Sequence, residues 1–350
     1  MIKLNVKQND MERLLKYHSE YMERSLKRNW KKMYAKADQR EAIIKIAGRV
    51  NDKIKERTEC QTSNTPTVSG QENADKLFLD NMLDCCTTRH LDTYAICTEE
   101  LFPDAVTRNS YKDILLKMTG YDRFSKVSEQ KGSGQEKIWN RQTLLQSLHT
   151  NVCPYCNRQY ITSFQRNGNS VATADIDHYY PRSQYPLLSM NFFNLIPSCC
   201  VCNSRLKGSK KIDPKGRTLH PYFDESDSLR FRTAEDVTGY LYHDKDPELF
   251  LEVNKEKDKD VQERAENSKE VFYLEKVYQA HVSEVKKIRD NVYRFSSKKF
   301  DSVFQKNYNE IFRDYEEFRE ALFYFNNLDE SEEPLVKLKK DIYRQLYEET

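Results

Sequence analysis

The chain has 350 residues, of which 32% are charged and 38% hydrophobic, and its formal net charge is only +2. This length suits one large domain or two to three small ones, and the high charge with only 9 glycines favours long solvated helices over an all-β architecture. The near-neutral charge excludes a protein that is basic overall, so any electropositive surface must be local.

No apolar run reaches the roughly 20 residues of a membrane span, and the first residues, MIKLNVKQND, lack the apolar centre of a signal peptide. We therefore expect a cytoplasmic protein without a membrane contact. In a reducing compartment, nine cysteines indicate metal ligands or buried thiols rather than disulfides.

The N-terminal region, residues 1–150, is predicted to be helical. Apolar residues recur at helical steps over 9–60, with a break near Ala37–Asp38. Residues 10–60 hold 14 Lys/Arg and 9 Asp/Glu, a difference of +5. A solvated outer face is favoured over a nucleic-acid or partner surface. Polar composition predicts mobile loops near 61–73 and 125–137, and the remaining predicted helices are Ala74–Cys85, Leu91–Leu101, Ser110–Met118 and Trp139–His149.

The C-terminal region, residues 226–350, is predicted to contain short strands and then charged helices. Alternating apolar and polar residues indicate strands at 229–233, 239–243 and 249–253. From about Asp260 onward, apolar and aromatic residues recur at helical spacing, which is typical of a packed core. With the segment between them, 151–225, the two regions predict a mainly α protein with a small α+β core.

Two C-x2-C pairs stand out in 151–225. Cys153 and Cys156 are followed, after 42 intervening residues, by Cys199 and Cys202. Two residues between cysteines let one tight turn present both sulfurs to a single ion, and zinc prefers four thiolates in a tetrahedron. A closed site of this kind has a structural role. Cys200 leaves the register open, because it also lies within reach of Cys202, although the symmetry of the pairs favours Cys199.

The residues between and after these pairs resemble the HNH endonuclease family in its zinc-stapled form. The matching stretches are CPYC, DIDHYYP, NFFNLIP and CCVCNSRLKG, over about 153–208, with a looser match at HPYF (220–223). The resemblance implies a ββα-metal unit, in which two antiparallel strands and a helix hold one divalent cation. It also implies an enzyme that hydrolyses phosphodiester bonds of nucleic acid, with DNA favoured over RNA.

The resemblance assigns roles to four residues. His178 is the general base, since a neutral histidine can take a proton from water. Asp177 and Asn203 are the protein ligands of Mg2+ or Mn2+, which prefer oxygen donors. Asn194, 16 residues after His178, braces the loop and orients the histidine. Asp175 receives no catalytic role, although it shares a strand face with Asp177.

A basic stretch begins just after Asn203. Residues 205–217 hold six Lys/Arg and one Asp, a net charge of +5, beside the expected phosphodiesterase centre. Substrate contact is favoured over a solvated loop for these cations. His220 is assigned either to the site or to a structural role, and the best candidates for substrate contact are Lys207, Arg182, Lys210 and Lys211.

The resemblance extends to HNH nucleases of bacterial anti-phage systems such as Septu and related retron modules, which act with an ATPase partner. The helical regions are then expected to select substrate, bind that partner or form a homo-oligomer. The alternative is a catalytically inactive, zinc-dependent protein that binds nucleic acid or acts as an adaptor. The presence of Asp177, His178 and Asn203 favours the enzyme.

Overall fold

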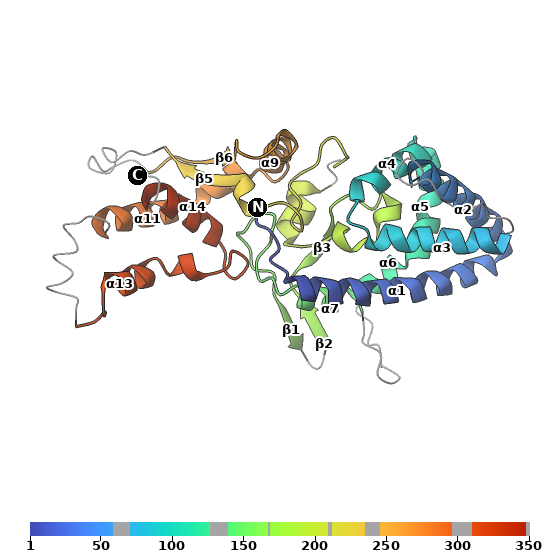
Figure 1. Ribbon diagram of the computed structural model, residues 1–350, viewed down its shortest axis with the longest axis horizontal. Coiled ribbons are helices and arrows are strands. Elements are labelled where there is room, and N and C mark those ends of the chain that lie inside the picture. Colours follow the sequence, from blue (N-terminus) through green and yellow to red (C-terminus); the bar gives the residue numbers. More distant parts are fainter. Residues whose placement is uncertain are drawn as a thin grey trace.

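The structure is a computed structural model that describes residues 1–58, 71–126, 139–166, 169–208, 212–234, 246–295 and 310–347. Figure 1 shows an elongated molecule, with the N-terminal helices at one end, the C-terminal helices at the other and short strands between them. The expectation of a mainly helical protein with small sheets is confirmed. The strand predicted at 239–243 and most of the two predicted loops lie outside the described residues.

The N-terminal helices form a layered bundle. Helix α1 buries a stripe that includes Met11, Leu14, Leu26 and Trp30, and α3 packs against both α1 and α2. None of the described helices has the length and apolar content needed to cross a membrane. The helices are α1 (Gln8–Tyr34), α2 (Ala37–Thr58), α3 (Gln71–Thr87), α4 (Leu91–Leu101), α5 (Ala105–Thr119) and α6 (Tyr121–Ser125).

Gly120 sets the angle between α5 and α6. Its φ of 73° lies in the left-handed region, which glycine adopts without strain. A Cβ at this position would also lie 2.9 Å from Oγ of Ser25 on α1. The glycine therefore lets α5 end against α1 and starts α6 at Tyr121, which lies beside the candidate site.

The described strands form three antiparallel pairs, two of them in the central segment and one in the C-terminal region. Helix α7 (Arg141–Ser147), which begins with a capping box at Asn140, leads into the central segment. Strand β3 pairs with β4 so that Asp177 lies opposite Ile196 and His178 opposite Leu195. A π-helical segment, η3 (Val201–Lys207), follows β4. The strands are β1 (Ser163–Arg166), β2 (Asn169–Ala172), β3 (Asp175–His178), β4 (Leu195–Ser198), β5 (Leu229–Thr233) and β6 (Leu249–Val253).

The C-terminal region packs helix α14 against β5 and α11. Strands β5 and β6 coincide with two of the predicted strands and alternate buried with more exposed residues. Asp341 on α14 accepts a hydrogen bond from the backbone N–H of Phe231 at 2.9 Å and pairs with buried Lys337 at 2.7 Å. The helices are α9 (Lys259–Val271), α10 (Leu274–Tyr278), α11 (Val282–Phe295), α13 (Tyr315–Leu322) and α14 (Val336–Tyr347).

Residues 1–6 run through the middle of the molecule and contact segments distant in sequence. The backbone N–H of Ile2 donates to the carbonyl of Pro154 at 2.8 Å, and that of Leu4 donates to the carbonyl of Pro221 at 2.7 Å. Met1, Ile2 and Leu4 are buried. This segment connects the first cysteine pair to the HPYF stretch.

Candidate zinc site and active site

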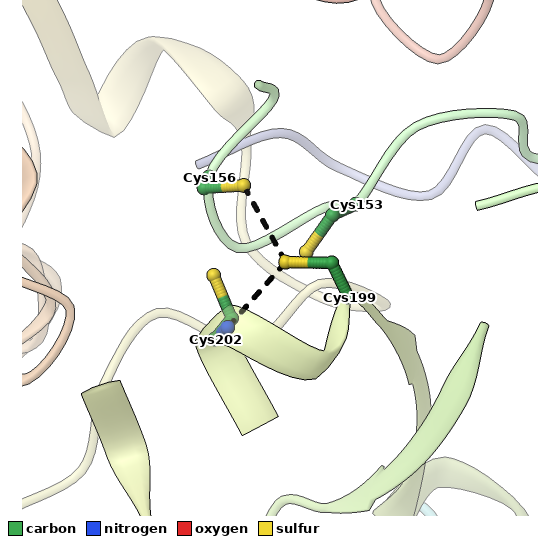
Figure 2. Close-up of side chains that lie close together, drawn as sticks. All are labelled: Cys153, Cys156, Cys199 and Cys202. Atoms are coloured by element: carbon green, nitrogen blue, oxygen red, sulfur yellow. Dashed lines mark hydrogen bonds between the residues drawn. The ribbon is translucent and has the colours of Figure 1, made fainter. Parts of the chain in front are cut away.

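Four buried cysteines meet at one point, as Figure 2 shows. The Sγ atoms of Cys153, Cys156, Cys199 and Cys202 all lie within 4.8 Å of one another. The Sγ atoms of Cys156 and Cys199 are 4.0 Å apart, and Cys199 Sγ also accepts a hydrogen bond from the backbone N–H of Cys202 at 3.4 Å. The cluster brings together the two C-x2-C pairs that the sequence singled out.

The cluster fits a zinc ion. Four sulfurs at Zn–S bonds of about 2.3 Å form a tetrahedron with edges of about 3.8 Å, close to the spacing of this cluster. Hydrogen bonds from Cys153 and the other two thiols lower the pKa of Cys199, whereas the same kind of contact raises the pKa of Cys202; binding of zinc requires all four as thiolates. Cys200 is exposed, so the second pair uses Cys199 and Cys202.

The loop of the first cysteine pair is anchored to the C-terminal region through Asn157. This buried residue has a φ of 48°, a left-handed conformation that asparagine tolerates. Its Nδ2 donates to the carbonyl of Glu330 at 2.7 Å, and its Oδ1 accepts from the backbone N–H of Lys337 at 3.1 Å. The turn that presents Cys153 and Cys156 is therefore fixed by residues about 180 positions later in the chain.

Asp175 and Asp177 share one face of β3, because side chains alternate along a strand. Asp177 is buried, and its Oδ2 accepts hydrogen bonds from the hydroxyl of Tyr155 at 2.7 Å and from Nζ of Lys207 at 2.5 Å. The same Nζ donates to the carbonyl of His178 at 2.5 Å. Lys207 is thus a neutralising internal cation, 2% exposed, and not the surface phosphate contact that the sequence predicted.

Asn203, in the first turn of η3, is hydrogen-bonded to Asp175, and within the described residues no hydrogen bond joins it to Asp177. Its Nδ2 lies 3.4 Å from Oδ2 of Asp175, so the residue without a predicted role is the one beside the amide. A π-helical bond from the N–H of Gly208 to the carbonyl of Asn203, at 3.0 Å, widens this turn. Such π-bulges are frequent at functional sites. The widened turn directs Asn203 toward Asp175 and Lys207 toward Asp177.

His178 lies on the other face of β3 and is buried. Its Nε2 is 3.0 Å from the carbonyl of Ser189, and a carbonyl only accepts hydrogen bonds, so Nε2 carries the proton and Nδ1 holds the lone pair. The ring packs on Tyr121, with centroids 4.7 Å apart. Burial, together with the charge of Arg182, lowers the pKa of His178 to about 3, which keeps the ring neutral at pH 7.

Asn194 holds the loop between β3 and β4 in place. Its Oδ1 accepts from the backbone N–H of Tyr180 at 2.7 Å, while its Nδ2 donates to the carbonyls of Tyr180 at 3.1 Å and Leu188 at 2.9 Å. Leu188 immediately precedes Ser189, the partner of His178. Asn194 therefore fixes both ends of the loop that orients the histidine.

The remaining predicted contact residues differ in exposure. Arg182 is exposed, and its guanidinium lies 4.5 Å from the centre of the Tyr121 ring. His220 is buried between Tyr179 and Phe223, and burial lowers its pKa to about 3, so it has a packing role here. Lys210 and Lys211 lie outside the described residues.

Tyr155 and Tyr121 were not identified from the sequence. Tyr155 lies between Cys153 and Cys156, and the zinc motif accounts for that stretch without giving the tyrosine a role. Its hydroxyl was the one available signal, because a buried hydroxyl needs a polar partner nearby. Tyr121 starts a five-residue helix that is 57 positions from His178 along the chain. No local pattern links the two.

Comparisons with known proteins give one partial match. A segment of 74 residues is 35% identical to "Protein ea31" of Escherichia phage lambda, and the match covers 21% of this chain and 21% of that protein. The match thus spans about a fifth of the relative's length. No protein-family model matches the chain. No solved structure matches it either.

Proposed function

We propose that this protein is a metal-dependent endonuclease of the HNH type, which hydrolyses phosphodiester bonds of nucleic acid. DNA is the favoured substrate and RNA the alternative. The observation that carries the proposal is the His178 ring, whose Nε2 is bonded to a carbonyl while its neighbours on β3 are two carboxylates. This arrangement leaves a neutral lone pair on Nδ1 of His178, on a strand that presents two carboxylates on its opposite face, and a base that activates water needs such a lone pair.

The order of elements supports the same proposal. Antiparallel strands β3 and β4 are followed directly by the helical segment η3, which agrees with a ββα arrangement. Of the four clustered cysteines, Cys153 and Cys156 precede β3, Cys199 directly follows β4, and Cys202 lies in η3. In this proposal the zinc ion has a structural role, and the hydrolytic chemistry belongs to residues between the cysteine pairs and to Asn203, which directly follows the second pair.

The oxygen donors of the site fit a hard divalent cation. Asp175, Asp177 and Asn203 would hold Mg2+ or Mn2+, because these ions prefer carboxylate and amide oxygens. When bound, such an ion neutralises charge that develops on the phosphate and lowers the pKa of its bound water. Lys207 keeps the buried Asp177 carboxylate compensated, and His178 accepts the proton of the attacking water at Nδ1.

Asn194 acts through His178 and does not contact substrate. Its bonds to the loop hold the Ser189 carbonyl against Nε2, which fixes the tautomer that a base needs. A role in bacterial anti-phage defence, with an ATPase partner, follows only from the resemblance of the sequence to HNH proteins of such systems.

One observation favours the alternative of an inactive zinc-dependent adaptor. Asp177 already has a buried cation, Lys207, at 2.5 Å, and a carboxylate neutralised in this way has less need of a metal ion. The two functions differ in one measurable respect, since only the enzyme converts substrate when a divalent cation is added.

A cleavage assay tests the proposal. Supercoiled plasmid, single-stranded DNA and tRNA are incubated with the protein in Mg2+ or Mn2+, and His178→Ala is compared with wild type. We expect the variant to lose at least about a hundredfold in rate, the usual contribution of a general base. The matched control is His90→Ala, which removes an exposed histidine.

Two outcomes contradict the proposal. A His178→Ala protein that cuts as fast as wild type, with its zinc retained, removes the assigned base. A wild-type protein that binds nucleic acid but cuts none of the three substrates in either metal supports the adaptor instead.

A further inference from the structure

A short series of aromatic rings leads away from His178 along the N-terminal helices. Tyr121 packs on His178 at 4.7 Å, Phe124 lies 6.5 Å from Tyr121, and Tyr21 of α1 lies 6.1 Å from Phe124, as ring-centroid distances. The rings come from β3, α6 and α1, so they connect the candidate site to the surface of the helical bundle. Arginines accompany this series along its length.

Two arginines lie around Tyr121. The guanidinium of Arg182 stacks over its ring at 4.5 Å, which is cation–π geometry. Burial raises the pKa of Tyr121, and the charges of Arg182 and Arg141 both oppose that rise, so Arg141 of α7 also lies close. Nε of Arg141 is buried and has no hydrogen-bond partner within the described residues, which is unusual for a charged group.

Two more arginines lie around Tyr21. Burial raises the pKa of this tyrosine, and the charges of Arg123 and Arg28 oppose the rise. Burial and the neighbouring Arg123 both lower the pKa of Arg28, so these two guanidiniums repel one another. Arg28 donates to Oγ of Ser25 at 3.1 Å, which is a neutral partner.

The described residues contain no carboxylate in a salt bridge with any of these four arginines. Other described arginines do have carboxylate partners, as when Arg217 contacts both Asp92 and Asp260. The acids whose charges act on Tyr121 are Asp122 and Asp177, and Asp177 is already paired with Lys207. Four guanidiniums from four separate elements therefore form a locally positive surface in a chain whose net charge is only +2.

We propose that Arg28, Arg123, Arg141 and Arg182 form a surface that binds the phosphates of a nucleic-acid strand and leads that strand to His178. This inference rests on the proposed nuclease function and names the part of the chain that holds the substrate. Guanidinium groups bind phosphate through two parallel hydrogen bonds. A polyanion also relieves the repulsion between unpaired cations, so binding is favoured at a surface where the free protein leaves its charges uncompensated.

The test measures binding separately from cleavage. A fluorescein-labelled 30-nucleotide DNA strand, the same sequence as a duplex, and its RNA equivalent are titrated by anisotropy without added divalent metal, from 50 to 300 mM KCl. We compare wild type with the variant carrying Arg28→Gln, Arg123→Gln, Arg141→Gln and Arg182→Gln. A control removes the same charge from arginines in other parts of the chain: Arg13→Gln, Arg40→Gln, Arg294→Gln and Arg313→Gln.

Loss of phosphate contacts reduces the dependence of affinity on salt. The slope of log K against log salt falls by about 0.9 for each lost contact with a duplex and by about 0.7 with a single strand. For the quadruple Arg→Gln variant we expect the slope of log K against log salt to fall by about 3, and the affinity at 100 mM KCl to fall at least about tenfold. The slope and affinity of the control should stay near those of wild type. The four Arg→Lys changes keep the charge, so they restore most of the slope and report on correct folding.

The outcomes separate this inference from the proposed function. If the quadruple Arg→Gln variant binds with the affinity and salt dependence of wild type, the four arginines do not hold the nucleic acid, even if the wild type is an active nuclease. If the variant loses binding but the wild type cuts nothing in Mg2+ or Mn2+, the surface holds and the nuclease proposal fails. A wild type that binds none of the three probes overturns the inference and points to an acidic protein partner.

Discussion

Helix α1 and the segment from β3 to Tyr222 are both well packed, but they bury different chemistry. Most buried side chains of α1 are apolar and recur at helical steps. Between β3 and Tyr222 the buried residues include many polar ones, and several of them bond to a partner in another element or loop, as Asp177 does with Lys207 and Asn194 with Tyr180. Apolar contacts tolerate small shifts, whereas buried polar groups must find a specific partner. The stability of the central segment therefore depends on individual hydrogen bonds and ion pairs.

The zinc site provides the largest test of this difference. Cys153→Ser combined with Cys156→Ser removes two of four ligands. Structural zinc contributes about 10–16 kcal/mol of apparent binding energy in small domains, so we expect the central segment to unfold while the N-terminal helices persist. Metal analysis and limited proteolysis, with fragments identified by mass spectrometry, measure this outcome.

The matched control for the zinc site is Cys200→Ser, which changes an exposed thiol in the same turn and should leave the zinc bound. If the double variant retained one zinc per chain, the four-cysteine site would be wrong. If it lost zinc but kept its proteolytic pattern, the ion would not stabilise the central segment.

Breaking the buried ion pair of Asp177 and Lys207 should cause the next largest loss of stability. Asp177→Ala leaves the ammonium of Lys207 uncompensated at 2% exposure, and breaking a buried pair in this way costs about 3–5 kcal/mol. Asp177→Asn with Lys207→Met removes both charges, so it should be clearly more stable than the single variant. Urea denaturation of the zinc-bound proteins, without added Mg2+ or Mn2+, compares them.

The exposed pair of Glu23 and Lys27 is the control for this experiment, because screening by solvent makes Glu23→Ala nearly neutral. Equal losses from Asp177→Ala and Glu23→Ala would contradict the difference between the two regions.

Acid should destabilise the contact between the helical bundle and the central segment through His18. Nε2 of this α1 residue lies 2.8 Å from the carbonyl of Met190, its Nδ1 accepts from Trp139 at 3.1 Å, and burial lowers its pKa to about 4. Between pH 6.5 and about 4 the unfolded chain binds a proton that the folded chain does not, so stability falls as the pH is lowered. The full effect is about 3 kcal/mol.

His18→Gln removes this titration, and we expect a flatter dependence of the unfolding free energy on pH between 7 and 4.5 than in wild type. Other buried histidines, His178 and His220, contribute to the remaining slope in both proteins. Parallel pH profiles for wild type and His18→Gln would contradict the role given to His18.

The smallest expected loss of stability comes from removing the cap at the start of α7. The side chain of Asn140 accepts hydrogen bonds from the backbone N–H groups of Gln142 and Thr143, both at 3.0 Å. Replacing such a cap by alanine costs about 1 kcal/mol, and Asn140→Asp should recover most of it. A change in melting temperature of a few degrees between the two variants checks this, and equal losses would show that the cap bond does not matter.

The sequence predicted the parts of the fold that follow a local period or a fixed spacing. Helix α4 and strands β5 and β6 begin and end where the pattern indicated, because apolar repeats reflect the burial of one face. The cysteine cluster was likewise predictable, since zinc imposes its ligands and their spacing.

Contacts between distant residues were not predictable in the same way. Lys207 was expected to face the substrate because basic residues near a phosphodiesterase centre usually do, yet the π-turn of η3 directs it inward to Asp177. The pairing of Asp175 with Asn203 depends on the same turn. One extra residue in a helical turn rotates every later side chain, and no composition or periodicity signal over seven residues reports it.

The path of residues 1–6 has a consequence for how the molecule assembles during synthesis. These residues are synthesised well before their hydrogen-bond partners, which include Pro154 and Pro221. At about 5–20 residues per second, about 10–40 s pass before the last of these partners is made. During that interval Met1, Ile2 and Leu4, all buried in the finished protein, have no site to occupy. Residues 1–6 thus reach their buried positions only after residues 154 and 221 have been made, long after their own synthesis.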